Sequence, residues 1–400
     1  MNWVGIIGRT QRLSRRGVAA VALVALAACG QSASPAANQA SPPAQKATSA
    51  AGSPQRGAES SAAAGGGAAG LKALIDGART EGQLALVWGE GTEGGTPGIK
   101  ALADGLNKQY GLNLQVQFTP GPSIPEMGAK LIQEYQTHRS ATSDLYFGFA
   151  ANFVPLVQAD ALEKVDWPQS VPNLRSDMVG GDGVAVAIED SLPGITYNTN
   201  KIKGDLVPKS LQDLLKPEYK GRIASTPYAA NFDYLSMDSV WGEQRTADYL
   251  RKFTKQVAGL IRCTEHARVQ SGEFDILALD CGQGSTYELK SKGAPLDFVI
   301  PSDAPLLLPA YLGVPKNAAH PNAAKLWVNY VMSRQGQDIL YKYDFGDSPL
   351  VAGSKEAPDL QKLQASGVKL QTIDLATMLA QNPKELARRR AEMQKILKSK

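Results

Sequence analysis

The sequence is poor in the side chains that most often carry out covalent chemistry. Among 400 residues there are three histidines, His138, His266 and His320, and three cysteines. The motifs H-E-x-x-H, G-x-S-x-G and C-x-x-C and the P-loop do not occur in it. General-base candidates are therefore few. We predict a protein that is not an enzyme and that needs no cofactor and no metal.

An excess of one charge is also missing once the first 28 residues are set aside. The chain has 42 Lys and Arg against 38 Asp and Glu, and four of the arginines but no acid fall within residues 1–28. The rest of the chain is electrically neutral, and no basic stripe remains that would indicate nucleic-acid binding. No apolar run after residue 28 is long enough to span a bilayer.

What the sequence does contain is a secretory leader. Residues 1–16 are basic, and residues 17–28 are small and apolar, as in a signal peptide. The tetrapeptide at 26–29 resembles a bacterial lipobox, which implies that Cys29 is lipidated and becomes the first mature residue. Several acyl chains would anchor the protein stably. The alternative is an ordinary cleaved signal followed by a chance cysteine.

A tether follows the leader. Residues 29–70 consist mainly of Ala, Ser, Gly, Pro and Gln and contain no large apolar side chain. Such a segment cannot bury enough surface to fold, so we predict that it is disordered. The folded part would then begin at Leu71.

The two remaining cysteines, Cys263 and Cys281, are candidates for a disulfide. An exported chain meets an oxidising compartment in which such a bond persists. Two buried free thiols are the alternative. A metal site is disfavoured, because only His266 lies near them in the sequence and the spacing is not that of a zinc site.

Short apolar segments alternate with segments of helical periodicity after Leu71. Residues 112–118 alternate apolar and polar side chains with a period of two, as a strand does. This order predicts an α/β fold with a mostly parallel, doubly wound sheet. The predicted strands are 83–88, 112–118 and 143–149, and the predicted helices are 71–82, 97–110, 124–138 and 151–160.

Four segments, in this order, resemble motifs of one protein family. Residues 75–88 carry A-x-x-E-G before a strand, and residues 109–118 resemble the family's second strand. Residues 194–224 carry Y-N-x-x-K and then P-x-S-x-x-D-L-L-x-P-x-x-K-G-x-I, and residues 312–340 carry H-P-x-A-A-K-L. Together these motifs resemble the extracellular solute-binding lipoproteins of bacterial ABC importers, in the branch that contains ferric-iron and polyamine binders.

The resemblance implies the periplasmic-binding protein type II fold, in which two doubly wound lobes are joined by two crossover strands. We expect lobe one at 71–182 plus 315–400 and lobe two at 199–295. The hinge crossovers would lie at 183–198 and 296–314.

The resemblance also implies a function. A monomer anchored in the cell envelope by its lipid would capture a small molecule or ion between the lobes and deliver it to an ABC permease. A tethered sensor that signals to a membrane partner is one alternative, and an enzyme built on the same fold is another.

In this fold the ligand sits in the cleft, at strand ends and helix N-termini. Some candidates have structural alternatives: the loop at 88–92 as a simple turn, Phe149 as a core residue and Asp233 as a helix N-cap. The candidate ligand-binding residues are Trp88, Glu90, Thr92 and Phe149 in lobe one, Thr226, Tyr228, Asn231, Asp233, Tyr234, Asp280, Gln283 and Tyr287 in lobe two, and Asp303 at the hinge.

The cargo stays open at this point. Iron binders of the family use adjacent tyrosines, whereas the comparable position here reads Ser285-Thr286-Tyr287. A polyamine or other organic cation would need carboxylates beside aromatic faces. A small organic or phosphorylated anion could instead be held by backbone amides and hydroxyls.

The C-terminal part has one further prediction. The basic segment 379–400 could bind a membrane surface. The alternative is a terminal helix that packs on lobe one through Leu386, Met393, Ile396 and Leu397. We assign no role to residues 351–375.

Overall fold

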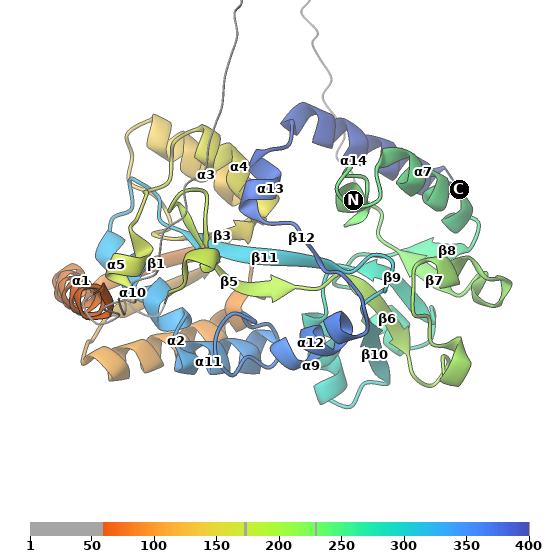
Figure 1. Ribbon diagram of the computed structural model, residues 1–400, viewed down its shortest axis with the longest axis horizontal. Helices are drawn as coiled ribbons and strands as arrows, with labels where there is room; N and C mark the ends of the chain where they lie inside the picture. The colour runs from red at the N-terminus through yellow and green to blue at the C-terminus, as the bar shows by residue number, and fades with distance from the viewer. Residues whose placement is uncertain (1–58, 172–173, 229, 400) are drawn as a thin grey trace, which may run out of the picture. The chain divides into compact units, whose positions relative to one another are not determined.

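The computed structural model describes residues 59–171, 174–228 and 230–399 (Figure 1). The predicted leader, the lipidated Cys29 and most of the predicted tether therefore lie outside the described residues. Residues 59–70, which we predicted to be disordered, belong instead to helix α1 (Glu59–Glu81). Among the described helices, none combines the length and the apolarity needed to cross a bilayer.

The first group of strands is built around β11 (Leu306–Gly313). β11 pairs antiparallel with β3 (Tyr146–Phe149) and with β5 (Ala185–Ser191), and β5 pairs with β4 (Val179–Gly180). The parallel pair of β1 (Gln83–Trp88) and β2 (Gln115–Pro120) joins this group through a bridge from Leu86 to Leu145.

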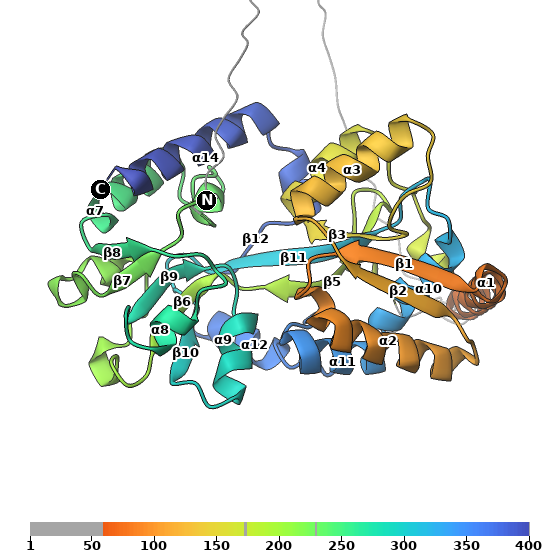
Figure 2. The same cartoon turned by 180° about the vertical axis from the view of Figure 1, so that it is seen from behind.

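Helices cover both faces of these strands. α2 (Gly95–Tyr110) packs on α11 (Arg334–Asp344), whereas α3 (Ile124–Gln136) packs on α4 (Ala150–Gln158) on the other side (Figures 1 and 2). α1 packs on α5 (Trp167–Ser170) and α10 (Pro321–Val331). The α2–α11 side encloses an apolar core that includes Trp88, Leu102, Leu145 and Trp327. We call this part lobe one.

The second sheet has the strand order β10-β6-β9-β7-β8. Parallel pairs join β7 (Ile223–Ser225) to β8 (Val257–Leu260) and to β9 (Ile276–Asp280). β6 (Gly194–Asn198) and β10 (Leu296–Val299) are antiparallel to their neighbours. Its helices are α6 (Phe232–Leu235), α7 (Glu243–Phe253), α8 (Ala267–Gln270) and α9 (Gly284–Ser291). We call this part lobe two. The predicted α/β class is confirmed, but the sheets are mixed rather than mostly parallel, because β11 pairs antiparallel with β3 and β5, and β6 pairs antiparallel with β9 and β10.

The chain passes between the sheets twice along this path. It leaves β5 and enters β6 through residues 192–193, and it leaves β10 and enters β11 through residues 300–305. Both passages lie inside the segments that the sequence indicated as crossovers. β5 and β11 are paired neighbours in the sheet of lobe one and form the crossover ladder. One passage leaves the end of β5, and the other arrives at the start of β11.

Cys263 and Cys281 form a disulfide, with a Cα–Cα distance of 5.9 Å. The bond joins the loop after β8 to the residue that follows β9. It therefore fixes the ends of two strands at the edge of lobe two that carries the connections to α8 and α9.

We predicted that the C-terminal segment belongs to lobe one, but its helices pack on both lobes. α12 (Ala357–Ala365) is followed by β12 (Gln371–Thr372), which pairs parallel with β11. α13 (Leu375–Leu379) packs on α4 in lobe one, but α14 (Pro383–Lys398) packs on α6 and α7 in lobe two. Met393 and Leu397 lie in an apolar cluster that contains side chains of both lobes, among them Phe232 and Tyr249 of lobe two.

Acidic partners on lobe two explain where α14 docks. Arg390 contacts the carboxylate of Asp233 at 2.5 Å, and Arg389 donates to the carbonyl oxygen of Ser236 at 2.8 Å. Arg388 forms a bidentate pair with Glu243. The consecutive arginines therefore bind carboxylates and a carbonyl of the same chain.

We predict that Arg390→Ala destabilises the protein by about 1–3 kcal/mol, because it leaves the carboxylate of Asp233 buried without its cation. Asp233 is only 3% exposed. The measurement is chemical unfolding of the full chain at neutral pH.

The matched control is Arg388→Ala on the same helix. The side chains of its partners Glu243 and Glu385 are 31% and 42% exposed, so its loss should cost less than about 1 kcal/mol. Equal losses in the two variants would show that the Arg390–Asp233 pair does not hold α14 in place.

Candidate ligand-binding site

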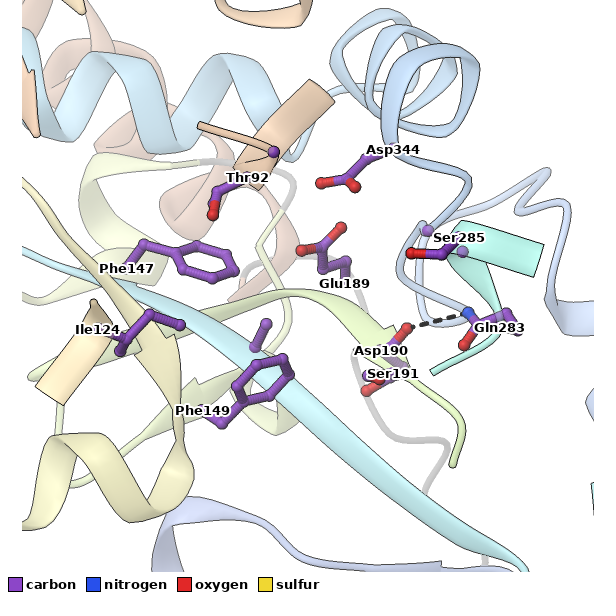
Figure 3. A pocket seen from close by; sticks show the side chains of 14 residues that line it. Thr92, Ile124, Phe147, Phe149, Glu189, Asp190, Ser191, Gln283, Ser285 and Asp344 are labelled. Carbon is purple, nitrogen blue, oxygen red and sulfur yellow. Dashed lines mark hydrogen bonds between the residues drawn. The ribbon is translucent and has the colours of Figure 1, made fainter. Parts of the chain in front are cut away.

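A cavity of about 330 Å³ lies between the two sheets (Figure 3). Lobe one supplies residues from the loop after β1, from β3 and from the end of α11, and lobe two supplies the start of α9. The crossover ladder forms its floor. We call it the cleft cavity, and it is lined by Gly91, Thr92, Ile124, Phe147, Phe149, Glu189, Asp190, Ser191, Gln283, Gly284, Ser285, Ala310, Asp344 and Gly346.

The loop after β1 turns sharply toward α11 before α2 begins. Glu93 and Gly94 have positive φ angles of 51° and 72°. A Cβ atom on Gly94 would lie 2.2 Å from the Cβ of Tyr343, so only glycine allows this close approach. The turn places Thr92 at the cavity and buries Glu93 completely beside it.

Two carboxylates converge on one side of the cleft cavity. Figure 3 shows the side chains of Glu189 and Asp344 pointing toward one another beside Thr92. The carboxyl group of Glu189 makes no hydrogen bond to any residue that the structure describes. Burial and the neighbouring charge of Asp344 raise the pKa of Glu189 well above its ordinary value. Burial also raises the pKa of Asp344 to about 6, although the backbone amides of Gly94 and Glu93 act against the shift.

The cleft cavity has no positive charge in its wall. No Lys, Arg or His occurs among the described residues that line it. The raised pKa values of Glu189 and Asp344 therefore reflect acids that are partly removed from water and have no cation beside them. A positively charged ligand would supply the counter-charge that the cavity wall lacks.

Aromatic rings and hydroxyl groups complete the wall. The rings of Phe147 and Phe149 lie edge to face, with centroids 6.2 Å apart. Thr92 and Ser285 face each other across the cavity from lobe one and lobe two. A ring face near a carboxylate suits a positively charged ammonium group, and hydroxyl oxygens can accept its hydrogen bonds.

Gln283 connects lobe two to the ladder beneath the cavity. Its side-chain oxygen accepts a hydrogen bond from the backbone N–H of Leu192 at 2.8 Å. Its side-chain nitrogen donates to the backbone oxygen of Asp190 and to the carboxylate of Glu356. Gln283 therefore spans the passage between β5 and β6 at the point where the lobes would move relative to one another.

The structure brings three of the predicted ligand-binding residues to the cleft cavity, namely Thr92, Phe149 and Gln283. Other predicted residues lie in the core or at the surface. Trp88 is buried and packs against Phe118 and Phe147, whereas Glu90 is exposed.

Several polar candidates in lobe two are engaged in holding the lobe together. Asp280 is fully buried and lies 2.6 Å from both the hydroxyl of Thr196 and the ring of His266. The side chain of Asn231 donates to the backbone oxygen of Asp280. Thr226 is buried and accepts from the amide of Ala230.

The remaining candidates are also placed elsewhere. Asp303 accepts hydrogen bonds from the backbone amides of Leu211 and Gln212, so it fixes a turn. Three lie away from the cavity: Tyr287 packs on Phe298, the hydroxyl of Tyr228 accepts from the amide of Cys263, and Asp233 pairs with Arg390. Tyr234 lines a separate cavity of about 340 Å³ with Arg390 and residues of α3 and α4.

The residues that sequence reasoning missed come from the hinge and from a distant segment. Glu189, Asp190 and Ser191 directly follow the apolar stretch 183–188, and that position at a strand end could have indicated them. Asp344 lies far along the chain at the end of a helix, and no local pattern marks it. Phe147 reads as an ordinary strand residue.

The cleft carboxylates do not form a preorganised metal cage. Among the described His, Cys, Asp and Glu residues, the group whose ligand atoms lie within 4.8 Å of one another is Cys263, Asp280 and Cys281. Both cysteines of that group are oxidised to a disulfide, so they cannot bind an ion as thiolates.

Comparison with known proteins places the chain among bacterial binding proteins. A family model described as bacterial extracellular solute-binding protein matches residues 136–379. An uncharacterised protein of Haemophilus influenzae is 28% identical over 224 residues, which are 52% of this chain and 62% of that protein. The chain thus spans less than two thirds of that relative.

Two named relatives bind different cargoes. The Fe(3+)-binding periplasmic protein of Serratia marcescens is 26% identical over 285 residues, covering 65% of this chain and 78% of its own length. The spermidine/putrescine-binding periplasmic protein 1 of Haemophilus influenzae is also 26% identical, over 157 residues, covering 37% of this chain and 43% of its own length.

Solved structures establish the fold. The substrate-binding protein of an ABC transporter from Agrobacterium tumefaciens superposes with a TM-score of 0.64 at 17% identity, covering 80% of this chain and 97% of that one. The periplasmic binding protein AfuA from Actinobacillus pleuropneumoniae gives 0.61 at 18% identity, covering 80% and 99%. The predicted periplasmic-binding type II fold is therefore confirmed.

The buried acid behind the cleft cavity leads to a prediction about pH. Burial raises the pKa of Glu93 to about 8, against a hydrogen bond from the indole of Trp327 and with help from the charge of Asp344. Between pH 4.5 and about pH 8, Glu93 is therefore protonated in the folded protein and ionised in the unfolded chain. Stability due to Glu93 should therefore fall as pH rises across that window.

We expect the free energy of unfolding of Glu93→Gln to fall less with rising pH than that of the wild type. The gain in stability over the wild type should therefore be present at pH 8 and absent at pH 4. The measurement is the free energy of unfolding as a function of pH. Glu90→Gln, on the exposed part of the same loop, should keep the wild-type profile. Parallel profiles for Glu93→Gln and the wild type would contradict the assignment.

Proposed function

We propose that this chain, which belongs to the family of bacterial extracellular solute-binding proteins, is the receptor of an ABC importer and captures a small organic cation in the cleft cavity. The observation that carries the proposal is the wall of that cavity, where Glu189 and Asp344 face each other without a basic residue. A bound ammonium group would restore the pairing that these carboxylates lack. Closure of the lobes around it would complete the contacts.

The same cavity wall disfavours a negatively charged cargo. A phosphorylated or carboxylated solute would meet Glu189 and Asp344 and find no Lys, Arg or His among the described lining residues. Like charges in contact repel more strongly beside partly buried groups than in bulk water. Of the cargoes left open by the sequence, a small anion therefore fits least well.

Ferric iron fits less well than an organic cation. The Serratia relative is named as an iron binder, but here Tyr287 packs on Phe298 and Ser285 occupies the cavity wall. A hard trivalent ion favours several converging oxygen ligands, and the described acids of the cleft cavity are not among the residues whose ligand atoms lie within 4.8 Å of one another. An ammonium group gains from rings and carboxylates together.

Anchoring and delivery belong to the same proposal. Lipidation at Cys29 would hold the protein at the cell envelope, and a permease would accept the cargo from the closed form. The proposed receptor acts as a monomer and performs no chemistry on its cargo, since binding and hinge closure are sufficient for delivery.

The test is calorimetric titration of the full mature chain carrying Cys29→Ser. Probes are spermidine, putrescine and choline as cations, fructose 6-phosphate as an anion, and ferric citrate. We expect one of the cations to bind, and to stabilise the protein by about 2.7 kcal/mol at one hundred times its Kd. Glu189→Gln and Asp344→Asn should each weaken that binding by about tenfold or more, as expected for loss of a charged hydrogen bond.

Glu90→Gln is the matched control, because this acid is exposed and lies outside the cavity wall. It should leave the affinity unchanged. Binding of fructose 6-phosphate or ferric citrate with no binding of any cation would overturn the choice of cargo. A cation that binds equally well to all variants would show that the cleft cavity is not its site.

A further inference from the structure

A second cavity lies against the crossover ladder. It has a volume of about 720 Å³ and is walled by β5, β11, α12, β12 and the loops at 348–350 and 367–370. β12 runs beside β11 and closes one edge (Figure 1). We call it the hinge-face cavity. The segment that encloses it includes residues 351–375, for which the sequence suggested no role.

A β-bulge decides which residues face each cavity. Pairing along the ladder joins Glu189 to Ala310 and then Ala187 to Tyr311, which leaves Ile188 as the extra residue. Glu189 and its partner Ala310 line the cleft cavity, whereas Ala187 and Tyr311 line the hinge-face cavity.

Asp190 follows the bulge and pairs with Pro309, which lines the hinge-face cavity. Since directly paired residues share one face of a ladder, the side chain of Asp190 is directed to the hinge-face cavity. Its backbone oxygen accepts from Gln283 at the edge of the cleft cavity. Glu189 thus lines only the cleft cavity, whereas Asp190 borders both cavities and directs its side chain to the hinge-face cavity.

The carboxyl group of Asp190 has no partner in the part of the chain that the structure describes. The residue is 9% exposed, so water compensates little of the lost hydration. Burial and the nearby charge of Asp347 together disfavour the ionised form and raise the pKa of Asp190 to about 7. Asp347 itself is satisfied, because it accepts from the hydroxyl of Ser354 and from backbone amides that follow it.

Most of the remaining wall is apolar. Leu307, Pro309, Tyr311, Leu350 and Leu360 line it. Amides from Gln361 and Gln364 lie among them on α12, and the volume falls in the range of small-molecule sites. The acids near Asp190 do not form a group with converging ligand atoms, so the wall does not match a metal ion.

We propose that the hinge-face cavity is a second ligand site, which binds a small organic ammonium compound with an apolar body. The ammonium group pairs with Asp190, and the apolar body packs on the leucines, Pro309 and Tyr311. The site is separate from the cleft cavity and does not depend on the identity of the imported cargo. An occupant there contacts β5, β11 and α12 at once, at the ladder from which the lobes diverge.

One alternative partner for Asp190 comes from the protein itself. Lys369 is exposed at the rim of the hinge-face cavity. If its ammonium group neutralised Asp190 in solution, the site would be closed to an external cation. The experiment therefore includes Lys369→Ala.

The probe is 2-phenylethylammonium, with neutral 2-phenylethanol as its matched analogue. Both are titrated calorimetrically into the full mature chain carrying Cys29→Ser, Glu189→Gln and Asp344→Asn, in which the cleft cavity has lost its facing acids. We expect one site for the ammonium probe and binding weaker by about tenfold for the alcohol. Adding Asp190→Asn should weaken the ammonium probe by the same factor and leave the alcohol unchanged.

Ala357→Phe is a second variant, because it fills the cavity without touching the charge. It should weaken both probes, and it decides the question if Asp190→Asn does not fold. Equal ammonium binding before and after these changes would overturn the proposal. Binding that appears only with Lys369→Ala would overturn it for the native protein. Since the cleft acids are already removed, a failed cargo assignment would not alter any of these results.

Discussion

The antiparallel ladder between β5 and β11 is the constraint on which the rest of the structure depends. Its two strands carry the chain between the lobes, and both cavities lie against them. A ladder in the middle of a molecule must satisfy its own backbone groups, and pairing does so without help from side chains. The side chains at its bulge are therefore free to face the cavities. Glu189 and Asp190, which directly follow the extra residue Ile188, occupy such positions.

Those acids oppose folding and favour binding for the same reason. A carboxylate removed from water without a partner raises the free energy of the empty protein. A ligand of opposite charge recovers part of that free energy when it binds. The raised pKa values of Glu189 and Asp190 record this condition, whereas backbone amides of Gly94 and Glu93 offset part of it at Asp344. Perturbed pKa values of this kind gather at functional sites more often than at structural ones.

The C-terminal segment extends the connection between the lobes. After α11 the chain forms α12, pairs β12 with β11, packs α13 on lobe one and ends with α14 on lobe two. Arg390 and Gln283 act at different points of this connection, one through Asp233 and the other through Leu192 and Glu356. Movement of the lobes must accommodate these contacts as well as the two crossover passages.

Local chemistry in the sequence determined the alternation of strands and helices, and it predicts a secretory leader. The resemblance to the binding-protein family indicated where the chain crosses between the lobes. It also indicated Thr92, Phe149 and Gln283, because each lies at or just after the end of a strand, where loops meet. Tertiary structure alone decided that Trp88 and Asp280 are interior residues and that α14 joins lobe two. It also divided Glu189 from Asp190 and brought Asp344 to the site. These outcomes depend on one bulge and on surfaces far apart in the chain, and neither leaves a periodic signal in the sequence.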